Sequence, residues 1–149
     1  MSLQPIWAIQ TRSRQIDLEQ FSAEVRPVSG AMGAYVHGLD VRDPDFEQLS
    51  RLLHSFKAVM LRGQPADLSI ADYVAFCRGL GELAVDPYVE PPFADHSEVM
   101  GLVRDADSDA YNFGGDWHSD GSYLERPGGL HVLGGKHVPT PGGDTLFPH

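Results

Sequence analysis

Residues 24–83 alternate short apolar stretches with polar turns, a pattern typical of brief strands and helices, whereas residues 1–20 lack strong periodicity and are expected to form a loosely ordered lead-in. Two such stretches, 24–28 and 34–38, flank the connection Ser29-Gly-Ala-Met-Gly33. Because glycine adopts the positive φ angles that a tight connection needs, this arrangement predicts a β-hairpin. A further apolar run at 58–61 is bounded by polar residues and predicts a short buried strand, although periodicity alone also allows a helical piece.

Two helices are predicted from apolar residues that recur every three to four positions. The first begins with Asp43 as N-cap and Pro44 as first helical residue, and it ends near residue 56. Its expected apolar stripe consists of Phe46, Leu49, Leu53 and Phe56. The second begins at Ser69, which forms a capping-box pattern with Asp72, and it ends before Gly81. Its expected inner face consists of Ile70, Tyr73, Val74, Cys77 and Leu80.

The second half of the chain is rich in turn residues. Nine of the 16 glycines fall between Gly114 and Gly143, and aromatic and apolar residues are interleaved with them. This density predicts short strands joined by sharp corners, and an apolar stretch at 98–103 predicts one more strand. We therefore expect a mixed α+β fold that is mainly β.

The charge balance limits the classes of partner. With 21 acidic and 11 basic residues the formal net charge is -10, which argues against nucleic acid or an anionic membrane as partner. A single cysteine, Cys77, makes no internal disulfide. The N-terminus has no positively charged start followed by an apolar run, and no segment approaches the roughly 18 to 20 apolar residues of a membrane span. We expect a cytoplasmic protein.

The segment 112–123 contains the pattern His118-Ser-Asp120, which has the residue types of a metal site. On an extended chain, residues two apart share one face and lie about 6 to 7 Å apart along the strand. His118 and Asp120 would therefore reach one metal ion. An imidazole and a carboxylate supply two ligands of a facial triad of two histidines and one carboxylate on Fe(II), and a second histidine must come from elsewhere. A lone His-x-Asp pair also forms ordinary surface hydrogen bonds.

Several motifs together resemble the taurine dioxygenase family, Fe(II)- and 2-oxoglutarate-dependent oxygenases that include the chlorophenoxyacetate dioxygenases. The most specific are Trp117-His-Ser-Asp120 and Gly142-Gly-Asp-Thr145, and the segments 33–40, 59–64 and 76–83 occur in the same order as in that family. The resemblance covers nearly the whole chain. It implies an incomplete double-stranded β-helix, a cupin-like jelly roll with flanking helices. Residues 1–149 would form a single partial domain that corresponds to the family's N-terminal half.

The resemblance also implies roles for individual residues. His118 and Asp120 would be iron ligands, and Thr145 would donate its hydroxyl to a carboxylate of the cosubstrate 2-oxoglutarate. The family's distal histidine ligand and its 2-oxoglutarate-binding arginine have no counterpart here, because no arginine follows Arg126. His131 and His137 are expected to be solvated or hydrogen-bonded, not ligands.

Four residues are expected to line the substrate pocket: Asp86, Tyr88, Asn112 and Trp117. The implied reaction hydroxylates a small organic substrate, a taurine-like sulfonate or another small acid, with O2 as second substrate and with release of succinate and CO2. Asp86 would repel a sulfonate, which argues against taurine itself. The implied partners are these small molecules, with a homo-oligomer also possible.

Two other functions fit the same residues. One is a catalytically inactive fragment or binding module, which would lack the distal histidine and the arginine and would expose open strand edges. The other is a hydrolytic zinc enzyme that uses His118 and Asp120. The zinc enzyme is the weakest of the three, because the chain has no clustered set of histidines.

Overall fold

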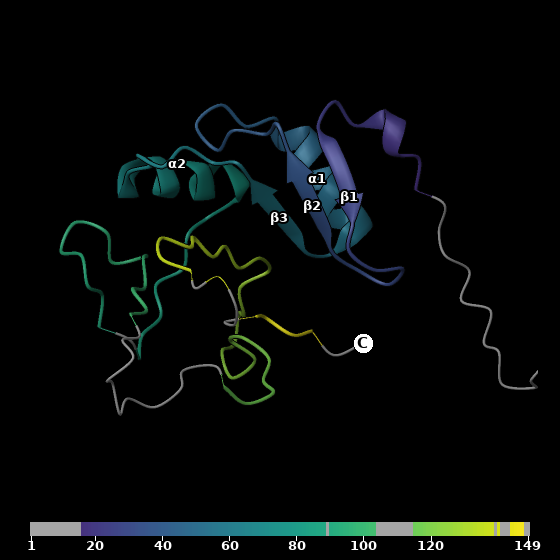
Figure 1. Cartoon of the computed structure of the whole chain (residues 1–149). Helices are drawn as coiled ribbons and strands as arrows, with labels where there is room; N and C mark the ends of the chain where they lie inside the picture. The colour runs from purple at the N-terminus through teal and green to yellow at the C-terminus, as the bar shows by residue number, and fades with distance from the viewer. Residues whose placement is uncertain (1–15, 89, 104–114, 139, 141–143, 148–149) are drawn as a thin grey trace, which may run out of the picture. The chain divides into compact units, whose positions relative to one another are not determined.

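The computed structural model describes residues 16–88, 90–103, 115–138, 140 and 144–147. By its internal contacts the chain divides into two compact units, residues 1–68 with 146–149, and residues 69–145. The expected single partial domain stays a prediction. In the described residues of the first unit, three strands form a small sheet, and one α-helix packs against it (Figure 1).

The strands of the first unit form one sheet in the order β1-β2-β3. β1 (Glu24–Pro27) and β2 (Ala34–His37) pair antiparallel, which confirms the predicted hairpin. Its connection ends at Gly33, whose φ of 90° is one that glycine adopts at little cost. β3 (Val59–Arg62) pairs parallel with β2, which confirms the strand expected at 58–61, although its residues are half-buried or exposed where a buried strand was expected.

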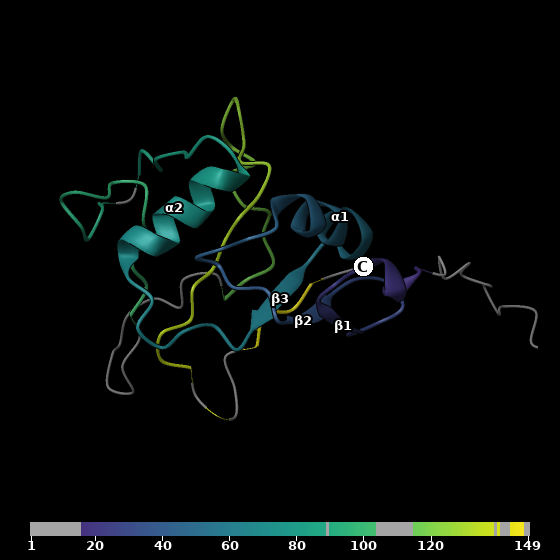
Figure 2. The ribbon, with the colours of Figure 1, turned by 90° about the horizontal axis from the view of Figure 1, so that it is seen from above.

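The helix α1 (Phe46–Phe56) covers one face of this sheet, as the two views in Figures 1 and 2 show. Its N-cap is Asp45, whose Oδ1 accepts from the backbone N–H of Gln48 at 2.8 Å, so the expected cap at Asp43 was wrong by two residues. Asp43 instead donates its N–H to the carbonyl of Asp40 in a turn. The core of the first unit consists of Phe21, Ala23, Val25, Ala34, Val36, Leu39, Val41, Leu49, Leu52 and Phe56.

The buried face of α1 differs from the predicted stripe. Leu52 is fully buried and Gln48 is 4% exposed, whereas Leu53 is only half-buried. The cause is the Gln48 side chain, whose Oε1 accepts from Ser22 N, Ser22 Oγ and Ala23 N. Because this amide points into the core, the inward face is centred nearer Leu52 than Leu53.

The second unit contains α2 (Ile70–Leu80), which begins with the predicted capping box of Ser69 and Asp72 and ends at Gly81. Val74 and Phe76 are its buried residues. Val74 was predicted to face inward but Phe76 was not, and the other residues of the predicted inner face are half-buried. After α2 the described chain runs as loops without helix or strand (Figure 1).

The expectation of a mainly β fold was therefore wrong for the described residues, where two 11-residue helices outweigh three four-residue strands. The expected strand at 98–103 is absent from them as well. A strand needs a neighbour for its ladder of hydrogen bonds, and the described chain after α2 offers no paired strand. The mixed α and β character is confirmed, and the jelly roll stays a prediction.

Candidate metal-binding pair and its surroundings

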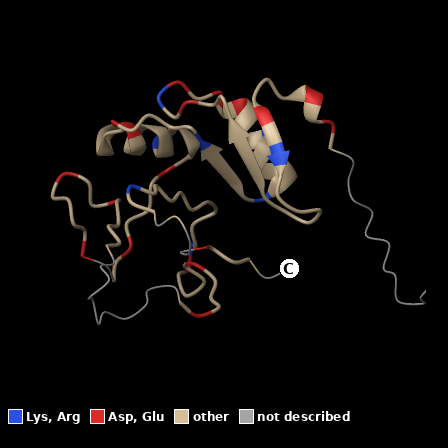
Figure 3. Cartoon of the chain, in the orientation of Figure 1, with Lys and Arg blue, Asp and Glu red and all other residues tan. Residues whose placement is uncertain are grey.

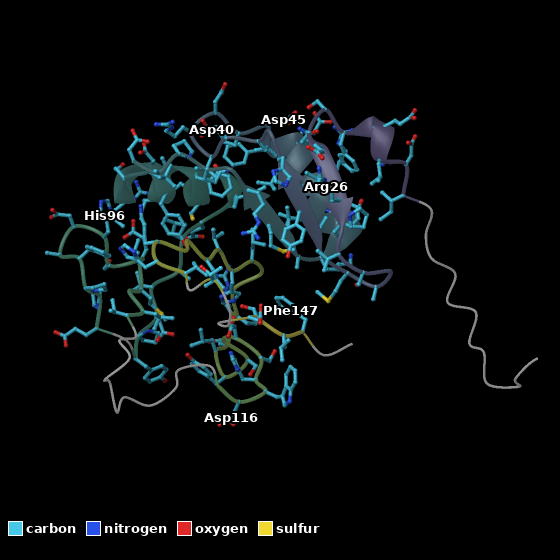
Figure 4. All side chains as sticks on the ribbon, viewed as in Figure 1. Arg26, Asp40, Asp45, His96, Asp116 and Phe147 are labelled. Atoms are coloured by element: carbon cyan, nitrogen blue, oxygen red, sulfur yellow. The ribbon has the colours of Figure 1, made fainter. Side chains whose placement is uncertain are left out.

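His118 and Asp120 face each other in a loop of the second unit. Nε2 of His118 lies 3.1 Å from Oδ1 of Asp120, and both side chains are about half exposed. On its other side the His118 imidazole places Nδ1 2.6 Å from the carbonyl oxygen of Asp116, which is labelled in Figure 4. Since a carbonyl only accepts, Nδ1 is the donor, and in the neutral imidazole Nε2 keeps the lone pair that a metal needs.

The same contacts change the proton affinity of His118. The hydrogen bond to the carbonyl of Asp116 is the largest cause that raises the pKa of His118, desolvation opposes it, and the nearby Asp120 carboxylate adds to the rise. A proton and a divalent cation therefore compete for Nε2 at the same place.

The separation of the two donor atoms fits one metal ion. Metal bonds of about 2.1 Å that meet at a right angle put their two donor atoms about 3.0 Å apart, which is the edge of an octahedron. The 3.1 Å between Nε2 of His118 and Oδ1 of Asp120 matches this edge. One imidazole nitrogen and one carboxylate oxygen are also suitable donors for Fe(II).

The local backbone differs from the prediction, because neither residue lies on a strand. Asp120 begins a turn in which the N–H of Leu124 donates to the carbonyl of Gly121 at 2.9 Å. Gly121 has a φ of 61°, a left-handed conformation that favours glycine. The Asp120 carboxylate therefore meets the His118 imidazole in an irregular loop that leads into a turn, and not on a shared strand face.

A second imidazole lies on the far side of the same carboxylate. Nδ1 of His131 is 3.6 Å from Oδ2 of Asp120, a distance that suits an ion pair but is too long for a hydrogen bond. Sequence reasoning did not connect these residues, because their approach depends on the path of a loop. Within the described ranges, no three His, Cys, Asp or Glu side chains form a group that could hold a metal ion.

Two of the predicted pocket residues, Asp86 and Tyr88, come together around a residue that the prediction missed, Tyr123. Oδ1 of Asp86 accepts from the N–H of Tyr88 at 2.8 Å, and Oδ2 accepts from the hydroxyl of Tyr123 at 3.2 Å. The two tyrosine rings meet edge to face with centroids 5.7 Å apart. Desolvation is the largest cause that raises the pKa of Tyr123, followed by the Asp86 hydrogen bond and the charges of Asp86 and Asp120.

The remaining predicted site residues are not brought into this cluster. Trp117 is 69% exposed, and Thr145 is exposed as well. Asn112 lies outside the described residues. Their assigned roles stay predictions.

An open pocket of about 540 Å³ lies elsewhere in the second unit and is lined by none of the predicted residues. Its polar lining residues are Arg78, Glu82 and Glu98. Glu98 pairs with Arg78 at 3.1 Å and lies 3.8 Å from Nδ1 of His96, which is labelled in Figure 4. The N–H of Glu98 itself is the first cause that lowers the pKa of this carboxyl, with the charges of Arg78 and His96 adding to it. The carboxylate is satisfied by these internal partners.

In the part of the chain that the structure describes, no helix is both long and apolar enough to cross a membrane. The predicted cytoplasmic location and the predicted partners stay predictions.

Comparison with known proteins gives two findings. A family model described as taurine catabolism dioxygenase TauD, TfdA family matches residues 24–149. An alpha-ketoglutarate-dependent sulfate ester dioxygenase of Pseudomonas putida is 28% identical over 129 residues, which cover 83% of this chain and 40% of the relative. The chain thus spans well under half the length of the curated relative that it matches.

Proposed function

This chain belongs to the taurine catabolism dioxygenase TauD, TfdA family, and we propose on that basis that His118 and Asp120 supply two of the three protein ligands of an Fe(II) site. The observation that carries the proposal is the 3.1 Å separation of Nε2 and Oδ1. The Asp116 carbonyl supports it, because it holds Nδ1 of His118 as a donor and leaves Nε2 available.

The function that this arrangement supports best is a 2-oxoglutarate-dependent dioxygenase acting on a small organic substrate. When bound, Fe(II) with 2-oxoglutarate and O2 supplies the oxidising chemistry that hydroxylates the substrate and releases succinate and CO2. The chain's own share is to hold the metal through His118 and Asp120 and to receive a 2-oxoglutarate carboxylate at the Thr145 hydroxyl. A neutral hydroxyl donates to a carboxylate without burying a further charge.

The complete activity needs groups that this chain does not offer. The distal histidine and the cosubstrate-binding arginine of the family have no counterpart in its sequence. A 2-oxoglutarate carboxylate without its arginine loses charged hydrogen bonds worth about 1.5 to 3 kcal/mol each. We therefore propose turnover only for a polypeptide that also carries these groups, and metal binding for the chain as it stands.

Asp86, Tyr88, Asn112 and Trp117 are proposed to line the substrate pocket. The contact of Tyr88 and Tyr123 around Asp86 supports the first two residues. The name of the curated relative refers to a sulfate ester. For this chain we propose the broader class of small organic acids.

The experiment that tests the proposal is an anaerobic titration with Fe(II) in the presence of 2-oxoglutarate. A visible charge-transfer band is expected only if 2-oxoglutarate chelates a bound iron. Binding of Mn(II), followed by the loss of the free-ion EPR signal, measures the metal site alone. His118→Ala and Asp120→Ala should each weaken Mn(II) binding at least tenfold, whereas His137→Ala should not. Equal binding by all variants would overturn the assignment.

A catalytically inactive binding module is the second candidate function. It is favoured by the lack of a third ligand in the described chain, where no group of three His, Cys, Asp or Glu side chains could hold a metal. Metal binding that depends on His118 and Asp120 but gives no charge-transfer band at high 2-oxoglutarate would support this module. Appearance of the band would exclude it.

A further inference from the structure

The carboxylate of Asp120 has an imidazole beside each of its oxygens. Nε2 of His118 lies 3.1 Å from Oδ1, and Nδ1 of His131 lies 3.6 Å from Oδ2. The His131 contact is longer than a hydrogen bond, but an N–H of Nδ1 that points at Oδ2 still attracts the carboxylate. Neighbours on both sides therefore limit the rotation of a carboxylate that is about half exposed.

The charges of this region make the imidazoles important for Asp120. Between residues 81 and 138 the described acidic residues far outnumber Arg and Lys, of which this range contains Arg126 and Lys136 (Figure 3). The two ion pairs that the structure shows for Asp120 both join it to imidazoles. In such surroundings a histidine is a suitable group to orient the carboxylate.

The shape of the loop also places the His131 ring. A Cβ built at Gly128 would lie 3.3 Å from Nε2 of His131, so the imidazole occupies space that a larger residue would crowd. The turn that follows Asp120 passes the same point, because a Cβ at Gly121 would lie 3.8 Å from the backbone nitrogen of Gly128. The ring therefore has Nδ1 near the carboxylate and Nε2 next to Gly128.

The loop that carries His131 is fastened to α2 at the next residue. The hydroxyl of Tyr73, on α2, donates to the carbonyl of Val132 at 2.6 Å, although 59 positions separate the two residues. A Cβ at Gly134 would meet the Tyr73 ring at 3.4 Å, so the loop also passes close to this ring. A regular helix thus fixes the backbone beside His131, and such support keeps a side chain in one orientation.

We propose that His131 is a positioning residue that orients the Asp120 carboxylate, and that Tyr73 holds His131 in place through the Val132 carbonyl. This inference rests on the proposed function, because it concerns how the carboxylate ligand of that site is held. With Oδ2 directed toward His131, Oδ1 stays beside Nε2 of His118, at the separation that one metal ion requires. Groups that orient metal ligands in this way contribute about 10- to 100-fold to metal affinity.

Two other roles for His131 make different predictions. If its approach to Asp120 is incidental, the carboxylate rotates freely and Tyr73 only adds stability by joining the loop to α2. If His131 is itself a metal ligand, only an imidazole can serve. His131→Asn separates these roles, because the amide Nδ2 takes the place of the imidazole Nδ1 and nothing takes the place of Nε2.

The first test needs no metal. In the unchanged chain the Hα–Hβ couplings of Asp120, measured by NMR, should be unequal, as a single staggered rotamer requires. In His131→Ala they should move toward the average of several rotamers. His137→Ala removes an exposed imidazole from the same unit and should leave them unchanged. Averaged couplings in the unchanged chain, or unequal couplings that persist in His131→Ala, would overturn the proposal.

The second test measures Mn(II) affinity by the loss of the free-ion EPR signal, in variants whose NMR spectra show that they are folded. His131→Ala should weaken binding about tenfold. His131→Asn should bind within about twofold of the unchanged chain, because its amide still donates toward Oδ2. Unchanged binding in His131→Ala, or a loss in His131→Asn as large as in His131→Ala, would refute the positioning role.

Gly128→Ala and Tyr73→Phe disturb the position of His131 from two sides. The first crowds Nε2, and the second removes the hydrogen bond to Val132 but keeps the ring. Each should weaken Mn(II) binding about threefold, and neither should weaken it further in a His131→Ala background. Equal losses in both backgrounds would show that the two changes do not act through His131, which contradicts the role of Tyr73.

The outcomes keep this proposal distinct from the metal assignment. If His118→Ala and Asp120→Ala weaken Mn(II) binding but His131→Ala does not, the positioning role fails and the metal pair stands. If none of the three variants weakens binding, the metal assignment fails, and the metal-free couplings of Asp120 alone decide the positioning role.

Discussion

The carbonyl of Asp116 lies 2.6 Å from Nδ1 of His118 and so fixes which nitrogen of the imidazole faces Asp120. This contact is the largest single cause that raises the pKa of His118. The imidazole is therefore positioned by the backbone two residues before it, independently of any metal. The backbone of this loop thus orients the His118 imidazole as a candidate metal ligand.

The effects of the Asp116 carbonyl and of the Asp120 carboxylate on the pKa of His118 can be separated by changing Asp120 alone. In metal-free Asp120→Asn the pKa of His118 should fall but stay above the ordinary value, because the Asp116 carbonyl still accepts from Nδ1. NMR titration of the imidazole Hε1 measures this, with His118→Ala to assign the resonance. His137 provides a control imidazole on the same unit. A full return of the His118 pKa to its ordinary value would show that Asp120 was the main cause.

Tyr73 should titrate late in alkaline solution. Burial, followed by its interaction with Cys77, raises the pKa of Tyr73 to about 12. The folded state therefore holds this proton more tightly than the unfolded chain, so the contribution to stability is present below about pH 10 and is lost as the pH rises toward 12. Phenolate absorbance near 295 nm should show a late step that Tyr73→Phe removes. A late step that persists in Tyr73→Phe would contradict the assignment.

Replacing Gln48 should lower the free energy of unfolding by more than the size of its side chain suggests. Its Oε1 satisfies two backbone N–H groups, at Ser22 and Ala23, at 2.7 and 3.2 Å. Gln48→Leu leaves these donors without an acceptor and should lower the free energy of unfolding by about 2 to 4 kcal/mol. Urea denaturation measures the change. Gln20→Leu, at an exposed position with one local hydrogen bond, should change it by less than about 0.5 kcal/mol.

Replacing Lys57 by glycine should raise the stability of the fold. It caps α1 with φ 67° and ψ -40°, a sparsely populated conformation that costs a residue with a Cβ on the order of 1 to 3 kcal/mol. Lys57→Gly should raise the free energy of unfolding by about 1 kcal/mol, because it removes that cost and loses only an exposed contact of Nζ with the carbonyl of His54. Lys57→Ala keeps the strain and should not stabilise. A lower stability for the glycine variant than for the alanine variant would contradict this account.

Features that depend on neighbouring residues were predictable from the sequence. The capping box of Ser69 and Asp72 is encoded within four residues, and the hairpin is encoded by Gly33 between two apolar stretches. Both were confirmed. The buried face of α1 was not, because Gln48 turns inward to serve donors more than 20 residues earlier, and only tertiary structure reveals that demand.

The candidate site also combines one feature that is encoded locally with others that depend on tertiary structure. The approach of His118 to Asp120 was expected from their spacing, yet it occurs in a loop just before Gly121, where a strand was expected. The contacts of Tyr123 with Asp86 and of His131 with Asp120 join residues 37 and 11 positions apart through irregular loops. No periodicity encodes the path of such loops, so these partners were not foreseen.

The parallel pairing of β2 with β3 has a kinetic consequence. The chain leaves β2, forms α1 and returns as β3 beside β2, so each residue of β2 pairs with one that lies 25 positions later, as Ala34 does with Val59. The β1–β2 hairpin closes a short loop at little entropic cost, whereas the parallel pairing of β2 with β3 has to close the longer loop that contains α1 and should follow it. We expect this segment to acquire its structure early in synthesis, while the residues that carry the candidate site are still emerging.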